Sequence, residues 1–281
     1  RCDELFDRRG IYGEDGVAYP DNAERLIFFS KAIVEIARRV MPPLDVIHVH
    51  DWQTAFAPEL LKERRLPFKT VLTIHNLAFQ GSFWSPDFAL TNLPWSMFTA
   101  RGVEFFGNLN LLKGGILYAD AIATVSSRYA KEMQTAEFGC GLDVVIRENA
   151  HKLHGVLSGV NERTWNPATD ALIAKSYKPS SLNGKKACRA ALLEELKLGA
   201  EPRGPVFAMV ARLHEQKGLD ILMPVIDRML SGDARLVILG QGETDYEREL
   251  LIASRRHSDK FAFYRRDDDG PLARQEERVT T

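Results

Sequence analysis

The feature that most constrains the fold is a repeated change in hydrophobic period along the chain. Short runs rich in Val, Ile and Leu predict strands at residues 46–50, 70–75, 121–125, 153–157, 206–210, 236–240 and 261–264. Stretches with apolar residues three and four positions apart predict helices at residues 22–40, 54–65, 185–197, 219–230 and 244–256. This alternation predicts a doubly wound α/β sheet, in which helices cover both faces and the strands are almost continuously apolar.

The alternation stops once, between residues 161 and 205. Pro, Gly and polar residues gather there around one predicted helix, as they do at domain boundaries. A chain of 281 residues is long enough for two domains. We therefore predict a first lobe at residues 1–160, a hinge or linker with one helix at 161–205, and the start of a second lobe at 206–281.

Charge and cysteine content narrow the classes of function. The 37 basic and 38 acidic residues produce no overall field for nucleic acid or an anionic membrane, so we expect neither as a partner. No apolar run approaches the ~20 residues that span a bilayer. The cysteines Cys2, Cys140 and Cys188 are too far apart for a metal site and do not form a disulfide framework. A reducing cytoplasm is the expected compartment, and any anion binding is expected to be local.

Polar side chains follow two predicted strands of the first lobe, where ligands bind in open α/β sheets. Asp51 and Trp52 come after the first of these strands, and His75 and Asn76 after the second. A carboxylate beside an aromatic plane suits the hydroxyls and the C–H face of a sugar, and adjacent His and Asn side chains can donate and accept hydrogen bonds. We interpret these four residues as a binding site. Thr54 we interpret as a helix cap.

The second lobe carries a local cluster of positive charge after its first strand. Arg212 and Lys217 lie there at the start of a predicted helix, whose N-terminal amides would complete an anion site. Gly240 and Gly242 follow the next strand and allow the backbone to approach a ligand, although a Gly-x-Gly pattern is equally typical of a tight turn. We interpret two other motifs, Lys-Gly-Gly at 113–115 and Asp-Asp-Asp at 267–269, as structural or solvated.

Taken together, the segments resemble the glycogen synthase and starch synthase family, from residue 6 to residue 275. The resemblance rests on His-Asp-Trp-Gln-Thr (50–54), His-Asn-Leu-Ala-Phe-Gln-Gly (75–81), Arg-Leu-His-Glu-Gln-Lys-Gly (212–218), Leu-Gly-Gln-Gly (239–242) and further matches at 6–13, 112–116, 118–120, 124–126 and 165–167. This resemblance implies the GT-B fold, in which two Rossmann-like lobes face each other. It also implies a retaining glucosyltransferase that uses ADP-glucose as donor and an α-1,4-glucan as acceptor.

The same resemblance implies roles for the candidate residues. His75 would contact the donor glucose, with Asp51 and Asn76 near it, and Arg212 and Lys217 would neutralise the departing diphosphate. Trp52, Gly240 and Gly242 would bind substrate. No cofactor and no metal is implied, because the two cations take the place of Mg²⁺. The family works in the bacterial cytoplasm or, in plants, in the plastid stroma.

Some family features do not appear in the sequence. The Lys-x-Gly-Gly loop of the family would precede Arg1, and its Glu-rich motif would follow Gln275. The chain also begins without Met. We therefore expect both ends to be cuts, both lobes to be incomplete, and the chain alone to transfer no glucose. Two alternatives stay open: a related transferase that uses a UDP-sugar, and an inactive remnant that binds a glucan or a partner.

Overall fold

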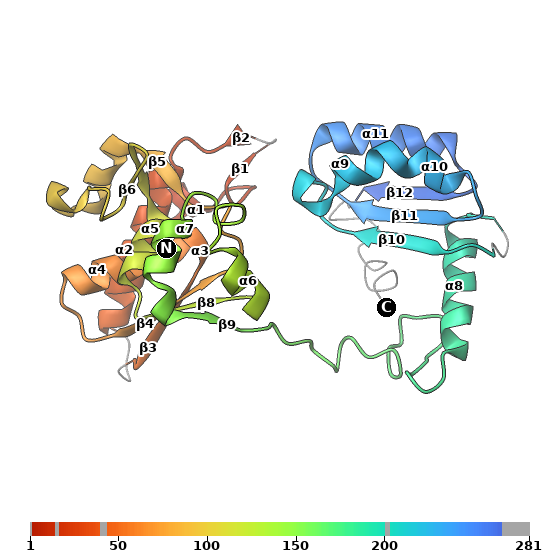
Figure 1. The fold of residues 1–281 in the computed structure, drawn as a ribbon, viewed down its shortest axis with the longest axis horizontal. Helices are drawn as coiled ribbons and strands as arrows, with labels where there is room; N and C mark the ends of the chain where they lie inside the picture. The colour runs from red at the N-terminus through yellow and green to blue at the C-terminus, as the bar shows by residue number, and fades with distance from the viewer. Residues whose placement is uncertain (1, 15–16, 40–43, 200–202, 266–281) are drawn as a thin grey trace. The chain divides into compact units, whose positions relative to one another are not determined.

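The chain separates into two compact units, Arg1–Gly159 and Val160–Thr281 (Figure 1). The structure, a computed structural model, describes residues 2–14, 17–39, 44–199 and 203–265. Each unit has its own sheet of parallel strands and its own hydrophobic core. The α/β class predicted from the alternation of strands and helices is therefore confirmed. The hinge role of residues 161–205 stays a prediction.

The first unit is built on four parallel strands in the order β3-β4-β8-β9. They are β3 (Val46–His50), β4 (Lys69–Ile74), β8 (Ala121–Thr124) and β9 (Leu153–Gly155), at the positions predicted from the sequence. The register pairs His50 with Thr73 and Ile74 with Thr124. Because all four strands run in the same direction, the loops that follow β3 and β4 leave from one edge of the sheet.

Three helices pack on one face of this sheet. They are α2 (Asn22–Arg39), α4 (Ala57–Glu63) and α5 (Leu111–Tyr118), whose buried residues join those of the strands in one core. On the other face Val46, His48 and His50 of β3 are exposed. Continuous burial was therefore the wrong prediction for β3. Its burial alternates, as in a strand with one solvent-exposed face, and the exposed positions hold Val46 and two imidazoles.

The helix predicted at residues 54–65 is two helices in the structure. The short α3 (Asp51–Thr54) starts directly after β3, and α4 begins at Ala57, with Pro58 in its first turn. Proline is favoured in a first turn because the amide that it lacks has no intrahelical acceptor there. The remaining elements of this unit are α1 (Asp3–Phe6), β1 (Gly13–Glu14), β2 (Val17–Ala18), α6 (Ser127–Glu132), α7 (Asp143–Glu148) and the 3₁₀ turn η3 (Ala150–Lys152).

A small antiparallel sheet lies between β4 and α5 along the chain. Its strands are β5 (Ser82–Trp84), β6 (Glu104–Phe105) and β7 (Asn108–Asn110), in the order β5-β7-β6, with the 3₁₀ helices η1 (Ser85–Thr91) and η2 (Trp95–Met97) between β5 and β6. A two-residue loop of Phe106 and Gly107, both with positive φ, joins β6 to β7. The amides of Leu111 and Leu112 donate to the carbonyls of Gly81 and Gln80, which fixes this sheet beside the loop after β4.

The second unit is a three-stranded parallel sheet covered on both faces. The strands β10 (Val206–Val210), β11 (Arg235–Gly240) and β12 (Phe261–Arg265) pair in that order. Helix α8 (Asn183–Glu195) covers one face, and α9 (Leu219–Leu222), α10 (Ile226–Leu230) and α11 (Thr244–Arg256) cover the other (Figure 1). Every residue of β11 is buried, as predicted.

The predicted helix at residues 219–230 is divided in this unit as well. A 3₁₀ turn, η5 (Met223–Val225), separates α9 from α10, with Pro224 in its first turn. Proline has no amide hydrogen to donate to the preceding turn, so the α-helical pattern is interrupted there. None of the helices in the described part of the chain is both long enough and apolar enough to cross a membrane.

Candidate functional site

A carboxylate and an imidazole meet at the edge where β3 and β4 end. Asp51 Oδ2 lies 2.9 Å from His75 Nδ1, and Asp51 Oδ1 accepts a hydrogen bond of 2.7 Å from the His75 amide. The carboxylate therefore holds both the backbone and the ring of His75. Because Nδ1 faces an acceptor, the neutral ring carries its proton there and leaves Nε2 for another partner. The structure brings these two candidate residues together, and their binding of a sugar stays a prediction.

The backbone of Asp51 is in the left-handed region, with φ of 52°. Such a conformation is uncommon for a residue with a Cβ, although Asp and Asn tolerate it better than most. It lets the chain turn from β3 directly into α3. Strained backbone of this kind gathers at functional sites, where the surrounding structure holds it in place.

The other residues of the 50–54 motif support this turn. The Trp52 indole packs between Tyr12 and Phe83, at centroid distances of 5.6 and 6.0 Å, and a Cβ on Gly81 would overlap it. Gln53 hydrogen bonds to the Tyr12 hydroxyl. The Thr54 hydroxyl accepts a hydrogen bond from the His50 amide and donates one to the His50 carbonyl, at 2.7 Å each. It therefore does not cap α4.

The loop after β4 is also tied down at several points. The Asn76 side chain accepts from the amide of Ala78 at 3.0 Å, which forms a local turn. The amide of Leu77 donates to the Tyr129 hydroxyl at 3.0 Å. These contacts fix the backbone that follows His75. Tyr129 was not found from the sequence, because it is 52 residues from Leu77 and lies outside the strand-end pattern.

Gln80 links the loop after β4 to two other segments. It donates to the carbonyl of Cys140 at 2.9 Å and accepts from the side chain of Asn110 at 2.7 Å. Cys140 itself has a positive φ of 48°. The loop after β4, the small antiparallel sheet and the segment around Cys140 therefore form one connected framework near His75.

Two further histidines extend the site along the exposed face of β3. The ring centroids of His48 and His50 are 4.3 Å apart, and those of His50 and His75 are 5.5 Å apart, with interplanar angles of 32° and 27°. Partial burial lowers the pKa of His50, and the imidazoles of His48 and His75 lower it further, against the opposing effect of Asp51. The sequence carried a signal for this row, because alternate residues of a strand share one face.

In the second unit, Arg212 and Lys217 are exposed in the segment between β10 and α9. Neither side chain makes a hydrogen bond or ion pair with another residue of the described part of the chain. The amides of Gln216, Lys217 and Gly218 are bonded within the 3₁₀ turn η4 (Glu215–Lys217) and its cap. Support for an anion from the first amides of the following helix stays a prediction, as do the roles of the two cations.

Gly240 and Gly242 allow two loops of this unit to run side by side. A Cβ on Gly240 would overlap the carbonyl oxygen of Ala211, and one on Gly242 would overlap that of Leu213. The Leu213 amide donates to Gln241, and its carbonyl accepts from Glu243, at 2.9 Å each. Both glycines therefore have a packing reason, and substrate binding by them stays a prediction.

Two motifs interpreted as structural lie elsewhere. The Lys113 ammonium is buried and donates to the carbonyls of Ala100 and Glu104, at 2.6 and 2.7 Å, which agrees with that interpretation. Residues 267–269 lie outside the described residues. Within the described ranges no group of three or more His, Cys, Asp or Glu side chains has the arrangement of a metal site.

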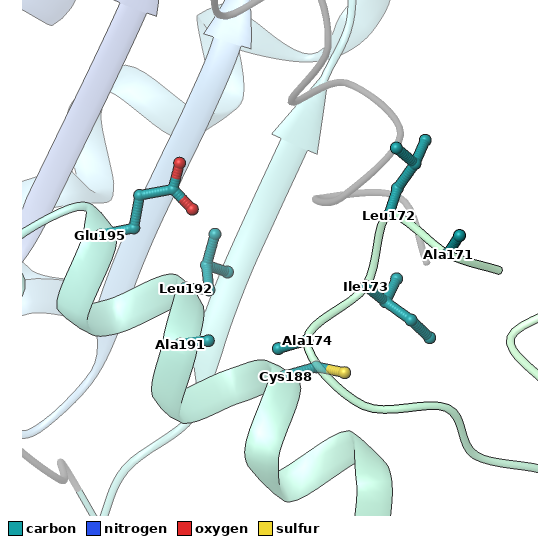
Figure 2. A pocket seen from close by; sticks show the side chains of 8 residues that line it. All are labelled: Ala171, Leu172, Ile173, Ala174, Cys188, Ala191, Leu192 and Glu195. Carbon is teal, nitrogen blue, oxygen red and sulfur yellow. The ribbon is translucent and has the colours of Figure 1, made fainter.

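A separate hollow of about 270 Å³ lies in the second unit, between residues 171–174 and α8 (Figure 2). Most of the side chains that line it are aliphatic, and the Cys188 thiol and the Glu195 carboxylate are the polar side-chain groups among them. The Cys188 sulfur lies 3.1 Å from the carbonyl oxygen of Lys175. None of the site residues predicted from the sequence is among the residues that line it.

Comparison with known proteins decides the family. The starch synthase catalytic domain matches residues 1–148, and glycosyl transferases group 1 matches residues 194–274. The chain belongs to the starch synthase catalytic domain family. The match covers β3, β4 and both residues of the Asp51–His75 pair.

Individual relatives agree with this assignment. A glycogen synthase of Opitutus terrae is 45% identical over 273 residues, which are 95% of this chain and 57% of that protein. A glycogen synthase of an Anaeromyxobacter species is 39% identical over 275 residues, which are 96% of this chain and 58% of that protein. The chain therefore spans little more than half the length of these curated relatives.

Solved structures agree on the fold. The catalytic domain of starch synthase IV from Arabidopsis thaliana, bound to ADP and acarbose, superposes with a TM-score of 0.86 at 28% identity, over 99% of this chain and 57% of that one. A UDP-forming trehalose-phosphate synthase from Burkholderia vietnamiensis matches with a TM-score of 0.51 at 18% identity, over 94% of this chain and 55% of that one. The second likeness concerns the fold alone, which is that of GT-B glycosyltransferases.

Proposed function

We propose that this chain is the glucosyl-transferring part of a glycogen or starch synthase, which moves glucose from ADP-glucose to the non-reducing end of an α-1,4-glucan. In this reaction the bond between glucose C1 and the β-phosphate oxygen breaks, and a bond forms between C1 and the acceptor hydroxyl oxygen. ADP leaves, and the hydroxyl proton passes to the diphosphate or to solvent. The supporting observation is the Asp51–His75 pair at the strand ends of a starch synthase catalytic domain.

The donor glucose is proposed to bind at His75. With Nδ1 held by Asp51, the Nε2 atom is left to hydrogen bond a sugar hydroxyl, and the exposed ring edge is accessible to it. Asn76 follows on the same loop and adds an amide beside the sugar. Trp52 contributes indirectly, because its packing on Gly81 fixes the start and the end of the site loop.

Arg212 and Lys217 are proposed to bind the diphosphate of the donor. Negative charge grows on the phosphate as the C1–O bond breaks, and a cation already in place stabilises that charge more than it stabilises the bound substrate. The absence of ion pairs to either side chain among the described residues leaves both cations available. Gly240 and Gly242 would shape the neighbouring loop. No cofactor takes part in this proposal, and the cytoplasm is the proposed location.

The test is transfer of labelled glucose from ADP-glucose into glycogen. Two proteins are assayed: the 281-residue chain, and a chimera in which the parts of the O. terrae enzyme outside the matched 273 residues are joined to it. We expect transfer by the chimera and a higher kcat/KM with ADP-glucose than with UDP-glucose. A preference for UDP-glucose would overturn the donor assignment, and glycogen binding without transfer by the chimera would overturn the enzymatic assignment.

The cation assignment is tested in the same chimera. Lys217→Ala and Arg212→Ala are expected to lower kcat by about 10²–10³, because each side chain acts on charge that develops in the transition state. Lys186→Ala and Arg255→Ala are matched controls, since both residues are exposed on helices α8 and α11 of the same unit. Near-normal kcat in Lys217→Ala would refute the cation assignment.

A further inference from the structure

The imidazoles of His48, His50 and His75 form a row along the carboxyl end of the first sheet. His48 and His50 are two residues apart on β3 and share its exposed face, while His75 follows β4. Both ends of the row are anchored to other side chains: His48 Nε2 lies 2.7 Å from the Thr73 hydroxyl, and His75 Nδ1 lies 2.9 Å from the Asp51 carboxylate. The row is therefore fixed at its two ends.

The middle ring has a different environment. The His50 imidazole makes no hydrogen bond or ion pair with another residue of the described ranges, and its backbone is held from both sides by the Thr54 hydroxyl. Its ring is tilted by 32° against that of His48 at a centroid distance of 4.3 Å, and it stacks on that of His75 at 5.5 Å and 27°. Aromatic rings packed at such separations attract each other, and each restricts the rotation of the other.

From this placement we infer that His50, backed by His48, is a positioning residue that holds the ring of His75 in the plane in which it contacts both Asp51 and the donor sugar. The Asp51 carboxylate holds the His75 ring at Nδ1 alone. A single hydrogen bond at one edge leaves the ring free to rotate about that bond. The stacked face of His50 supplies the second constraint. The catalytic consequence of this inference rests on the proposed function. Its structural part rests on ring geometry alone.

Electrostatics favours a neutral ring in the middle of the row. The groups that act on His50 are the imidazoles of His48 and His75 and, in the opposite sense, the Asp51 carboxylate, which is bonded to His75. A charged His50 would be partly removed from water and would place a cation against two other imidazoles, and these causes lower its pKa. A neutral ring stacks on His75 without repelling a proton there.

The structural part is tested by nitrogen NMR of the histidine rings in the purified 281-residue chain. The ¹⁵N shifts of His75 report which ring nitrogen carries the proton. We expect the Nδ1–H form in the wild type and in His50→Phe, whose ring preserves the stack, and an averaged signal in His50→Ala, which removes it. In His48→Gln and in His75→Gln the measured pKa of His50 is expected to rise. The control is His154→Ala, because His154 is exposed on β9, two strands away from β4.

The catalytic part is tested in the chimera described above. We expect His50→Ala to lower kcat about 10-fold with little change in KM, since modest misplacement of a catalytic group can reduce the rate by up to about 10². His50→Phe is expected to restore most of the loss. Circular dichroism of each variant verifies folding. Failure of all proteins to transfer glucose would refute the proposed function but would leave the NMR test of the row intact.

Two results would overturn the inference itself. The first is a His50→Ala variant whose His75 ¹⁵N shifts, and whose pH profile of transfer, match those of the wild type. The second is an equal loss in His50→Phe and His50→Ala with unchanged His75 shifts, which would show that position 50 acts through the fold of β3 and not through its ring.

Discussion

Glu59 gives a prediction that depends only on burial. It lies in α4, its side chain is fully buried, and neither carboxylate oxygen has a hydrogen-bond partner in the described part of the chain. A Cβ placed on Gly114 of α5 would be 2.7 Å from Glu59 Oε2, so the carboxyl group rests on that glycine. Burial raises the pKa of Glu59 from an ordinary value of 4.5 to about 8. Burial and, to a lesser extent, the Glu59 carboxylate raise the pKa of Tyr118.

The sign of the effect on stability follows from proton uptake. Between pH 4.5 and pH 8 the folded chain retains a proton on Glu59 that the unfolded chain has released, so stability falls as the pH rises. The stabilising contribution is complete below pH 4.5 and is lost once the pH passes 8. At about 1.4 kcal/mol for each pH unit, the full interval corresponds to about 5 kcal/mol. Water entry and local relaxation reduce such penalties, so we expect a loss of about 2–4 kcal/mol.

The substitution Glu59→Gln removes the ionisable group at nearly constant volume. We expect it to stabilise the first unit by about 2–4 kcal/mol at pH 8 and to leave stability at pH 4.5 within about 1 kcal/mol of the wild type, since both side chains are then neutral. Urea unfolding from pH 4.5 to pH 9, followed by tryptophan fluorescence in a Trp165→Phe background, reports on this unit, which holds Trp52, Trp84 and Trp95.

Glu63→Gln is the matched control for this prediction. Glu63 ends the same helix but is exposed, so its substitution is expected to leave the pH dependence of unfolding unchanged. Other carboxylates also titrate; one example is Asp21, whose pKa is lowered by the Arg8 guanidinium. Their contributions to the pH dependence of stability are the same in both variants and cancel in the comparison. If Glu59→Gln keeps the wild-type slope of unfolding free energy against pH, the argument from burial is refuted.

Two further substitutions test the strand ends. Gly242→Ala is expected to destabilise the second unit by about 2–4 kcal/mol, because its Cβ would overlap the backbone oxygen of Leu213; an unchanged melting temperature would contradict the close approach of the two loops. Asp51→Asn is expected to keep the positive φ of this turn and to change stability by less than about 1 kcal/mol, since Asn also tolerates that conformation. The same variant is expected to lower glucosyl transfer by about 10² in the chimera, and transfer at the wild-type rate would remove Asp51 from the proposed mechanism.

The strands could be predicted because hydrophobic runs of four to six residues mark them. β3, β10 and β12 each have five residues, and all seven strands of the parallel sheets were found. The small sheet of β5, β6 and β7 was not predicted, because each of its short strands contains a polar residue and lies in no hydrophobic run. The divided helices show a second limit: a proline such as Pro58 or Pro224 fits an apolar spacing while it changes the hydrogen-bond pattern.

The site could be predicted only in part. Asp51 and His75 were each found because they follow strands, and their pairing follows from the parallel register of β3 and β4. The positive φ that turns the Asp51 carboxylate toward His75 could not be read from the sequence, because Asp occurs far more often with negative φ. Tyr129 and Cys140 hydrogen bond to residues of the site loop that lie 52 and 60 positions away in the sequence, and only the folded chain reveals these contacts.

The density of polar and aromatic residues at 50–54 has a structural explanation. Of the residues that follow β3, only Asp51 contacts His75 directly, while Trp52 packs on Gly81 and Thr54 binds the backbone before the turn. A left-handed residue that must hold a carboxylate at 2.9 Å from an imidazole needs support from several directions, because a small displacement would break the contact. The motif therefore combines a carboxylate that holds His75 with the packing that supports it, and we expect substitutions at Trp52 to disturb the geometry of Asp51.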